Sequence, residues 1–178
     1  MDRNTFIYNF TNDPSVGRRQ KTYLCYEVQL LNGNPRVPLS SIRNFLHSQL
    51  CRHAELCFLD LTSFWQLYPW HHYRVTWFLS WSPCPDCARE VAAFLWRNRH
   101  VSLSIFAARI YTYHKGYEEG LRSLRDAGVH LVIMTYREFE YCWRAFVDNQ
   151  LLPFRPWNSL EENSQVISRR LQGILQDR

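Results

Sequence analysis

Residues 73–108 read YRVTWFLSWSPCPDCAREVAAFLWRNRHVSLSIFAA, and this stretch decides the fold. Its two ends, residues 73–80 and 101–108, are rich in β-branched and aromatic side chains and predict two strands. Between them a turn at Pro83 opens a helix over residues 85–97, with a proline near its first turn, where helices tolerate one. The succession of strand, helix and strand indicates an α/β architecture.

Strands and helices continue to alternate outward from this stretch. Toward the C-terminus we expect a helix over 117–127, a strand over 129–134, a helix over 137–147 and a final helix over 159–175. Alternation of this kind predicts a mixed sheet with helices on both faces, an α-β-α sandwich. The length of 178 residues favours one domain over residues 1–178.

The N-terminal part is less regular. Thr22 to Leu31 predicts a strand that ends at the turn Asn32-Gly33-Asn34-Pro35, the signature of a hairpin. Residues 37–49 show no clear period, so the second strand of this hairpin cannot be placed. Residues 53–65 carry apolar side chains at helical spacing and predict a helix.

His53-Ala54-Glu55 and Pro83-Cys84-Pro85-Asp86-Cys87 together supply one imidazole, two thiols and one carboxylate. Zinc binds nitrogen and thiolate ligands at tetrahedral corners, and a catalytic zinc keeps one corner for water. We therefore expect His53, Cys84 and Cys87 to hold Zn²⁺ and Glu55 to transfer protons. This spacing is the signature of zinc nucleobase deaminases. The thiols at a helix start would be stabilised as thiolates by the helix dipole.

A structural zinc site is the alternative, and it would need a fourth protein ligand. Cys51 and Cys57 are the candidates, because they lie close to His53 in the chain. A redox-active cysteine pair is a further reading of the two thiols. His71 and His72 suggest a metal site as well, but their neighbourhood is typical of a plain loop.

Composition limits the class of protein. The hydrophobic fraction of 46% and the charged fraction of 21% are those of a soluble globular protein, and the net charge of +5 fits a polyanionic partner. We expect Cys25 and Cys142 to be buried and free. No secretory signal or membrane-spanning run is visible, so we expect no membrane partner and a cytoplasmic or nuclear location.

The chain resembles the APOBEC/AID polynucleotide cytidine deaminases, most closely their antiviral APOBEC branch. Trp81-Ser82-Pro83-Cys84 and Ala108-Arg109-Ile110-Tyr111 carry this likeness, and residues 22–28, 133–136 and 153–157 support it. The likeness covers essentially the whole chain. It implies a five-stranded sheet flanked by about six helices. It also implies conversion of cytosine to uracil in single-stranded DNA, in antiviral or retroelement restriction.

The resemblance also implies contacts with the nucleic acid. Trp81 and Tyr111 would wall the base pocket beside Ser82, and Thr22 and Asn44 would contact the target nucleotide. The residues expected to hold phosphates or to meet the neighbouring nucleotide are Arg19, Gln20, Lys21, Arg170, Thr112 and Tyr113. Thr112 stands where many relatives have aspartate, so we expect 5′-TC to be favoured, with 5′-CC tolerated more than in those relatives.

Other activities share parts of this pattern. An RNA cytidine deaminase, or a nucleic-acid-binding restriction module with little catalysis, would carry the same residues. A free-nucleoside deaminase would need no basic rim, and a tRNA adenosine deaminase would lack the Ser-Trp-Ser run before Pro83. We expect a monomer or a weak oligomer, with single-stranded DNA as partner and RNA as a second candidate.

Overall fold

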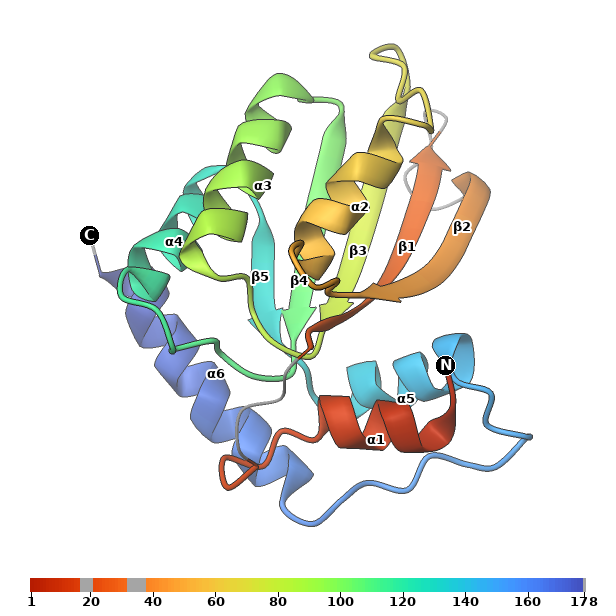
Figure 1. Ribbon diagram of the computed structural model, residues 1–178, viewed down its shortest axis with the longest axis vertical. Coiled ribbons are helices and arrows are strands. Elements are labelled where there is room, and N and C mark those ends of the chain that lie inside the picture. The colour runs from red at the N-terminus through yellow and green to blue at the C-terminus, as the bar shows by residue number, and fades with distance from the viewer. Residues whose placement is uncertain (17–20, 32–37, 178) are drawn as a thin grey trace.

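The computed structural model describes residues 1–16, 21–31 and 38–177, and within these ranges it contains one five-stranded sheet and six α-helices (Figure 1). In chain order the elements are α1 (Arg3–Phe10), β1 (Tyr23–Leu31), β2 (Pro38–His47), α2 (Ala54–Thr62), β3 (His72–Leu79), α3 (Pro85–Arg97), β4 (Val101–Ala107), α4 (Tyr117–Asp126), β5 (His130–Ile133), α5 (Tyr136–Phe146) and α6 (Leu160–Gln176). The predicted α/β class and the mixed sheet are confirmed. The predicted turn at 32–35 lies outside the described residues.

The sheet has the strand order β2-β1-β3-β4-β5. β1 pairs antiparallel with both β2 and β3, whereas β3, β4 and β5 run parallel to one another. The parallel half requires a crossover connection between successive strands, and α3 and α4 supply these crossovers. As a result the ends of β3 and β4 meet at one edge of the sheet, beside the starts of α2 and α3 (Figure 1).

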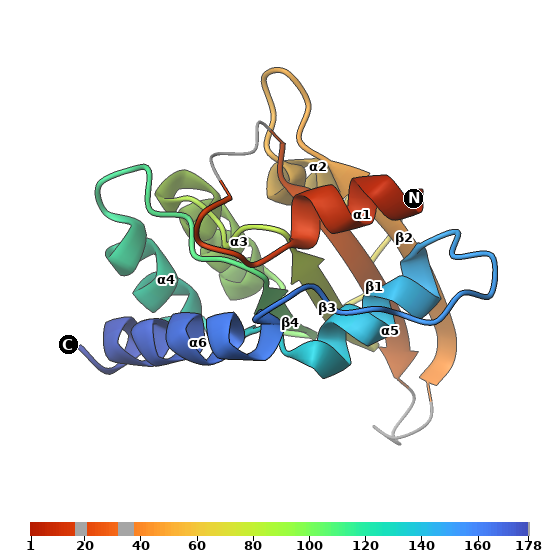
Figure 2. The ribbon, with the colours of Figure 1, turned by 90° about the horizontal axis from the view of Figure 1, so that it is seen from below.

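Alternation along each strand divides the core into two layers. Leu24, Tyr26 and Val28 of β1 pack with α2, α3, α4 and α6, while Cys25 packs with α1 and α5 on the other face. Figure 2 shows the sheet between α2 and α3 on one side and α5 on the other. Cys25 and Cys142 are buried and free, as expected.

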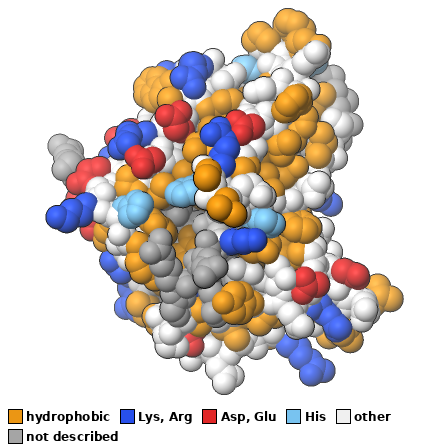
Figure 3. All heavy atoms as spheres, in the orientation of Figure 1, with side chains coloured by type: hydrophobic (Ala, Val, Ile, Leu, Met, Phe, Trp, Pro, Cys, Tyr) orange, Lys and Arg blue, Asp and Glu red, His pale blue; other side chains and the backbone are white. Residues whose placement is uncertain are grey.

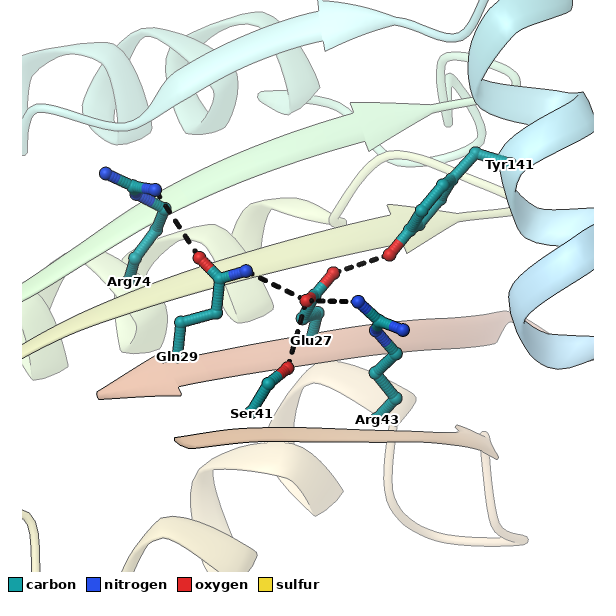
Figure 4. Close-up of polar contacts among 6 residues, drawn as sticks. All are labelled: Glu27, Gln29, Ser41, Arg43, Arg74 and Tyr141. Atoms are coloured by element: carbon teal, nitrogen blue, oxygen red, sulfur yellow. Dashed lines mark hydrogen bonds and ion pairs between the residues drawn. The ribbon is translucent and has the colours of Figure 1, made fainter. Parts of the chain in front are cut away.

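Polar side chains occupy the part of the second face that α5 leaves open (Figure 4). Glu27 of β1 is 7% exposed. Its carboxylate accepts hydrogen bonds from Tyr141 of α5 at 2.6 Å and from Arg43 of β2 at 3.0 Å. Gln29 and Ser41 donate to the same carboxylate at 2.9 and 3.0 Å. Because Glu27 pairs with Arg43 and Gln29 with Ser41 in the strand register, the network joins the hairpin to α5.

Two elements were not placed from the sequence. α1 begins at an Asp2 cap that accepts from the Thr5 amide and buries Phe6 and Phe10 against α5. β2 pairs with β1 from His47 opposite Tyr23 to Pro38 opposite Leu31. None of the described helices combines the length and apolarity that a membrane span requires.

Candidate metal centre and adjoining pocket

The three predicted zinc ligands lie at the starts of two helices. His53 is the N-cap of α2 and Cys84 the N-cap of α3, and both have extended backbone, at φ −70°, ψ 155° and φ −70°, ψ 166°. Neither side chain caps its own helix. Each is therefore available as a ligand. Cys87 follows in the first turn of α3, within reach of the same point.

The extended backbone at His53 resolves a geometric difficulty. Residues two apart on a helix face opposite sides, so His53 and Glu55 could not both face one centre from regular helical positions. Since His53 precedes the first helical residue, Ala54, its side chain is free of that constraint. Glu55, in the first turn, is buried with 2% of its surface exposed.

The distances fit a zinc ion. The Nδ1 atom of His53 lies 3.4 Å from Sγ of Cys84 and 3.3 Å from Sγ of Cys87. Tetrahedral zinc with bonds of about 2.0–2.1 Å to nitrogen and about 2.3 Å to sulfur would separate these ligands by roughly 3.6 Å. A small expansion of the site, by about 0.2–0.3 Å between these ligand atoms, is thus all that binding of the ion requires.

A fourth protein ligand is not in place. Among the residues that the structure describes, His53, Cys84 and Cys87 form the one group of His, Cys, Asp or Glu side chains close enough to share a metal. Cys51 is exposed, and Cys57 donates to the carbonyl of Arg52 at 3.8 Å. Within the described chain, three ligands favour an open, catalytic site over a structural one. His71 and His72 belong to no such group.

The protein groups of the site shift one another's ionisation. The thiol of Cys87 donates a hydrogen bond to the sulfur of Cys84. This bond favours the thiolate form of Cys84 and is the main reason that the pKa of Cys84 is lowered to about 5. The pKa of Cys87 is raised, chiefly by that same hydrogen bond. Burial, together with the smaller effect of the neighbouring Cys84 thiolate, raises the pKa of Glu55 to about 7. The site therefore holds one thiolate readily and keeps a carboxyl able to carry a proton near neutrality.

A cavity of about 170 Å³ opens directly onto this centre. Five residues expected to contact nucleic acid or wall the base pocket line it together with His53, Glu55 and Cys84: Thr22, Trp81, Ser82, Tyr111 and Tyr113. Ser48, Gln49 and Leu50 complete the lining and were not predicted. Ser48 is held against Thr22, since its amide donates to the Thr22 carbonyl at 2.9 Å.

The aromatic wall of this cavity is assembled from two strand ends. The ring of Trp81 lies 6.4 Å from Tyr111 and 5.9 Å from Tyr113, both edge to face, and the two tyrosine rings are 5.4 Å apart. The hydroxyl of Ser82 accepts the Tyr111 amide at 3.0 Å, which ties the loop after β4 to the loop after β3.

Arg109 supports this wall from behind. It is 4% exposed, and its guanidinium lies 3.9 Å from the centre of the Trp81 ring. Its Nε donates to the carbonyl of Ser80 at 3.1 Å and its Nη2 to that of Asn9 at 2.5 Å. A buried cation stacked on an aromatic face holds the ring in one orientation. Sequence reasoning used Arg109 as a mark of resemblance but did not assign it this role.

The remaining predicted contacts lie outside the cavity lining. Lys21 and Thr112 are exposed and directly adjoin the lining residues Thr22 and Tyr111. Arg170 of α6 donates to the hydroxyl of Tyr117 at 3.0 Å. Arg19 and Gln20 lie outside the described residues.

Asn44 is not brought to the cavity. It lies within β2, opposite Tyr26, and its side-chain oxygen accepts the amide of Phe45. Ser48, immediately after β2 ends, lines the cavity beside Thr22, and its hydroxyl accepts the Thr22 amide at 3.3 Å. The sequence could not locate this position because the end of β2 was not placed.

Comparison with known proteins gives a family match across the chain. A family model described as "APOBEC3, cytosine deaminase domain" matches residues 1–175. The chain is 52% identical over 185 residues to "DNA dC->dU-editing enzyme APOBEC-3G" of Lagothrix lagotricha, covering 99% of this chain and 49% of that protein.

Two further relatives carry the same name. The chain is 51% identical to the Papio anubis protein, covering 99% of this chain and 48% of that one. It is 50% identical to the Pongo pygmaeus protein, with 98% and 48% covered. The chain thus spans about half the length of the curated relatives it matches.

Proposed function

Because the chain belongs to the APOBEC3 cytosine deaminase domain family, we propose that it hydrolyses cytosine to uracil in single-stranded DNA. One observation supports this activity above the others. A buried carboxyl, Glu55, and a three-ligand metal centre face the same small cavity, which has an aromatic wall. This arrangement matches what a hydrolytic deaminase needs, namely a place for one base, a proton carrier and an open metal position.

The residues divide the chemistry among themselves. His53, Cys84 and Cys87 would hold zinc, which supplies the Lewis acidity that brings the pKa of water toward neutrality. Glu55 takes the proton of the attacking water and delivers it to N3 of cytosine, which makes C4 electrophilic. After the hydroxide adds to C4, Glu55 takes the proton of the new C4 hydroxyl and gives it to the amino group, which leaves as ammonia while the C4 carbonyl of uracil forms. Its burial keeps bulk water from competing for these transfers.

The cavity selects a single base out of its stack. Its volume of about 170 Å³ and its buried floor admit one base but no duplex. Trp81 and Tyr111 offer ring surfaces to the base, and Thr22 and Ser48 offer hydroxyls to its polar edge. A base inside a duplex cannot reach such a floor, so the strand must be single or the base flipped. The relatives named as DNA editing enzymes support DNA as the strand.

The experiment that tests this function compares three substrates. We expect the purified, zinc-loaded chain to release uracil from a single-stranded DNA oligonucleotide, and to act poorly on free cytidine and on the same sequence as duplex DNA. Uracil excision followed by strand cleavage measures the product. Activity on RNA alone would assign the chain to RNA editing. Binding to the oligonucleotide without any uracil would favour a binding module.

Four expectations from the sequence stay predictions: RNA binding, a monomeric or weakly oligomeric state, a cytoplasmic or nuclear location, and an antiviral role. Incubation of the chain with cellular RNA before the deamination assay would address the first of these.

A further inference from the structure

The loop between β2 and α2, residues 48–53, carries a fully exposed leucine beside the cavity. Leu50 belongs to the cavity lining, yet essentially all of its surface is open to solvent, so it lies at the rim. A single exposed leucine needs no explanation by itself. Leu50 differs because a base on its way to Glu55 must pass this rim. Figure 3 shows hydrophobic, histidine and cationic side chains next to one another near the centre of this face, over the start of α2.

A tight turn fixes the position of Leu50. The Gln49 amide donates to the Arg52 carbonyl at 2.8 Å and the Arg52 amide donates to the Gln49 carbonyl at 3.3 Å, which leaves Leu50 and Cys51 at the tip. The Arg52 guanidinium donates two hydrogen bonds to the carboxylate of Asp60 on α2, at 2.5 and 2.7 Å. The turn is therefore anchored to a helix, and it holds the leucine out in solvent rather than letting it fold back onto the protein.

The strand order places this turn across the cavity from the two tyrosines. β2 and β4 end at the same edge of the sheet, and β1 and β3 lie between them. Three inter-strand spacings of about 4.8 Å separate β2 from β4 by roughly 14 Å. Leu50, after β2, and Tyr111 and Tyr113, after β4, therefore line the cavity from opposite sides. A strand whose target base enters between these loops brings one neighbouring nucleotide to each of them.

The chemistry at the tip favours a base over a phosphate. Leu50 and Cys51 are uncharged, and the nearest cation in the turn, Arg52, is paired with Asp60. When one base leaves its stack, the faces of its neighbours lose their apolar cover. Proteins that open a base stack commonly insert Leu, Ile, Met or Phe into the gap. An apolar side chain fixed at the rim of a one-base cavity is suited to this use.

We propose that Leu50 packs against the base on the 3′ side of the target cytosine, in the space that the cytosine leaves when it enters the cavity. The loop after β4 is the one expected to meet the 5′ neighbour, and Leu50 lies on the other side of the cavity. Leu50 is thus a positioning residue, which holds the strand and takes no part in proton transfer. This inference rests on the proposed function, because that function supplies the strand.

The test removes the leucine and its partner base in turn. On a short single-stranded DNA with one central cytosine, Leu50→Ala should raise the KM for deamination about 10-fold, as expected for the lost burial of about two carbon groups. Its kcat should stay that of wild type. An abasic nucleotide on the 3′ side should raise the wild-type KM similarly, and Leu50→Ala should add nothing on that strand, because both changes remove one contact. An abasic nucleotide on the 5′ side should leave the effect of Leu50→Ala intact.

Two further variants serve as controls. Leu50→Met should keep most of the wild-type KM, because methionine is apolar and of similar volume. Leu151→Ala, at an equally exposed leucine outside the cavity lining, should behave as wild type on every strand. The Tm and zinc content of Leu50→Ala should match those of wild type, since the side chain is exposed and lies outside the ligand group. A merely structural role would lower the Tm.

The outcomes separate this inference from the function beneath it. A wild-type chain that releases no uracil from the intact strand would overturn the proposed function and, with it, the inference. If the wild-type chain is active and Leu50→Ala raises the KM equally on the intact and the 3′-abasic strand, the inference alone is wrong. It is also wrong if the effect of Leu50→Ala disappears on the 5′-abasic strand instead. A KM of Leu50→Ala equal to that of wild type on the intact strand would likewise remove Leu50 from the path of the DNA.

Discussion

Single residues at two helix starts determine what the centre can do. His53 and Cys84 are N-caps whose side chains leave their own helices uncapped, and Glu55 is buried one residue inside α2. A helix without a side-chain N-cap is less stable by roughly 0.5–2 kcal/mol. That cost is consistent with side chains retained for binding a metal, which returns far more free energy than a cap.

Glu55→Gln tests the proton carrier. The amide keeps the size of the side chain but cannot accept the proton of water, so deamination should fall by at least about 10²–10⁴-fold. Zinc content should stay at one ion per chain, because Glu55 lies outside the ligand group. Uracil release and elemental analysis measure the two quantities, with Glu90→Gln on α3 as control. Loss of zinc together with activity would mean that Glu55 is itself a ligand.

Removing a ligand or the metal should affect stability as well as activity. Cys84→Ser should lose zinc, and chelation of the wild-type chain should lower its Tm, because an ion that binds the folded state alone stabilises it by mass action. Cys51→Ser, at an exposed cysteine outside the ligand group, is the control and should keep its zinc. Thermal unfolding with and without chelator measures the effect. An equal fall in Tm for Cys51→Ser would indicate that Cys51 shares the metal.

At the scale of elements, the Glu27 network joins three of them. Four hydrogen bonds to one buried carboxylate offset the effect of its burial and hold the pKa of Glu27 below its usual range. A carboxyl with a lowered folded-state pKa stabilises the fold above its ordinary pKa, and this contribution is lost as the pH falls through the lowered value. The hairpin and α5 should therefore separate more easily in acid.

Glu27→Gln tests this network. We expect a loss of about 1–3 kcal/mol in the free energy of unfolding at neutral pH, as for hydrogen bonds to a charged group. The difference from wild type should shrink as the pH falls below the ordinary glutamate pKa of about 4.3 and through the lowered value, where the folded wild-type carboxyl is itself protonated. Urea unfolding across this range measures both. A difference independent of pH would show that the charge of Glu27 contributes nothing.

The loop after β4 should set the preference for the neighbouring nucleotide. Thr112 is exposed between Tyr111 and Tyr113, whose rings narrow the space beside the cavity. A hydroxyl both donates and accepts hydrogen bonds, whereas an ionised carboxylate only accepts. Thr112→Asp should therefore sharpen the preference for 5′-TC over 5′-CC. Sequencing of a deaminated single-strand library measures it, and an unchanged or purine preference would remove this loop from the reading of context.

Elements with a strong local signal could be predicted from the sequence. The bounds of α3 are as expected, because Pro85 marks its first turn and apolar residues such as Val91 and Leu95 recur at helical spacing. β2 and α1 could not be placed. β2 is an edge strand whose residues 40–44 are exposed, so no alternation marks it, and α1 depends on Phe6 and Phe10 packing on α5.

The site, too, could be predicted from the sequence only where its residues lie in local motifs. Its four central residues sit in short motifs, which sequence shows directly. Ser48 and Arg109 gain their roles only when strand ends meet in space, since Ser48 reaches Thr22 across the hairpin and Arg109 reaches Trp81 across β3 and β4. Such contacts have no local signal in the chain.

At the scale of the whole molecule, the metal centre and its aromatic wall lie at one edge of the sheet, just beyond the ends of β3 and β4. With a net charge of +5, the chain should attract a single strand over a wide area and release condensed counterions when it binds. The salt dependence of binding therefore reports how many phosphates the chain contacts.

Lys21→Ala tests the surface nearest the cavity. Log Kd for single-stranded DNA should rise linearly with log salt, and each lost phosphate contact should reduce the slope by about 0.7. Since Lys21 is exposed beside Thr22, which lines the cavity, its loss should reduce the slope for short and long strands alike. Fluorescence anisotropy at several salt concentrations measures this slope, with Arg155→Ala as an exposed control. Equal slopes for wild type and Lys21→Ala on the short strand would exclude Lys21 from the path of the DNA, because an exposed cation away from the phosphates releases no counterion when the strand binds.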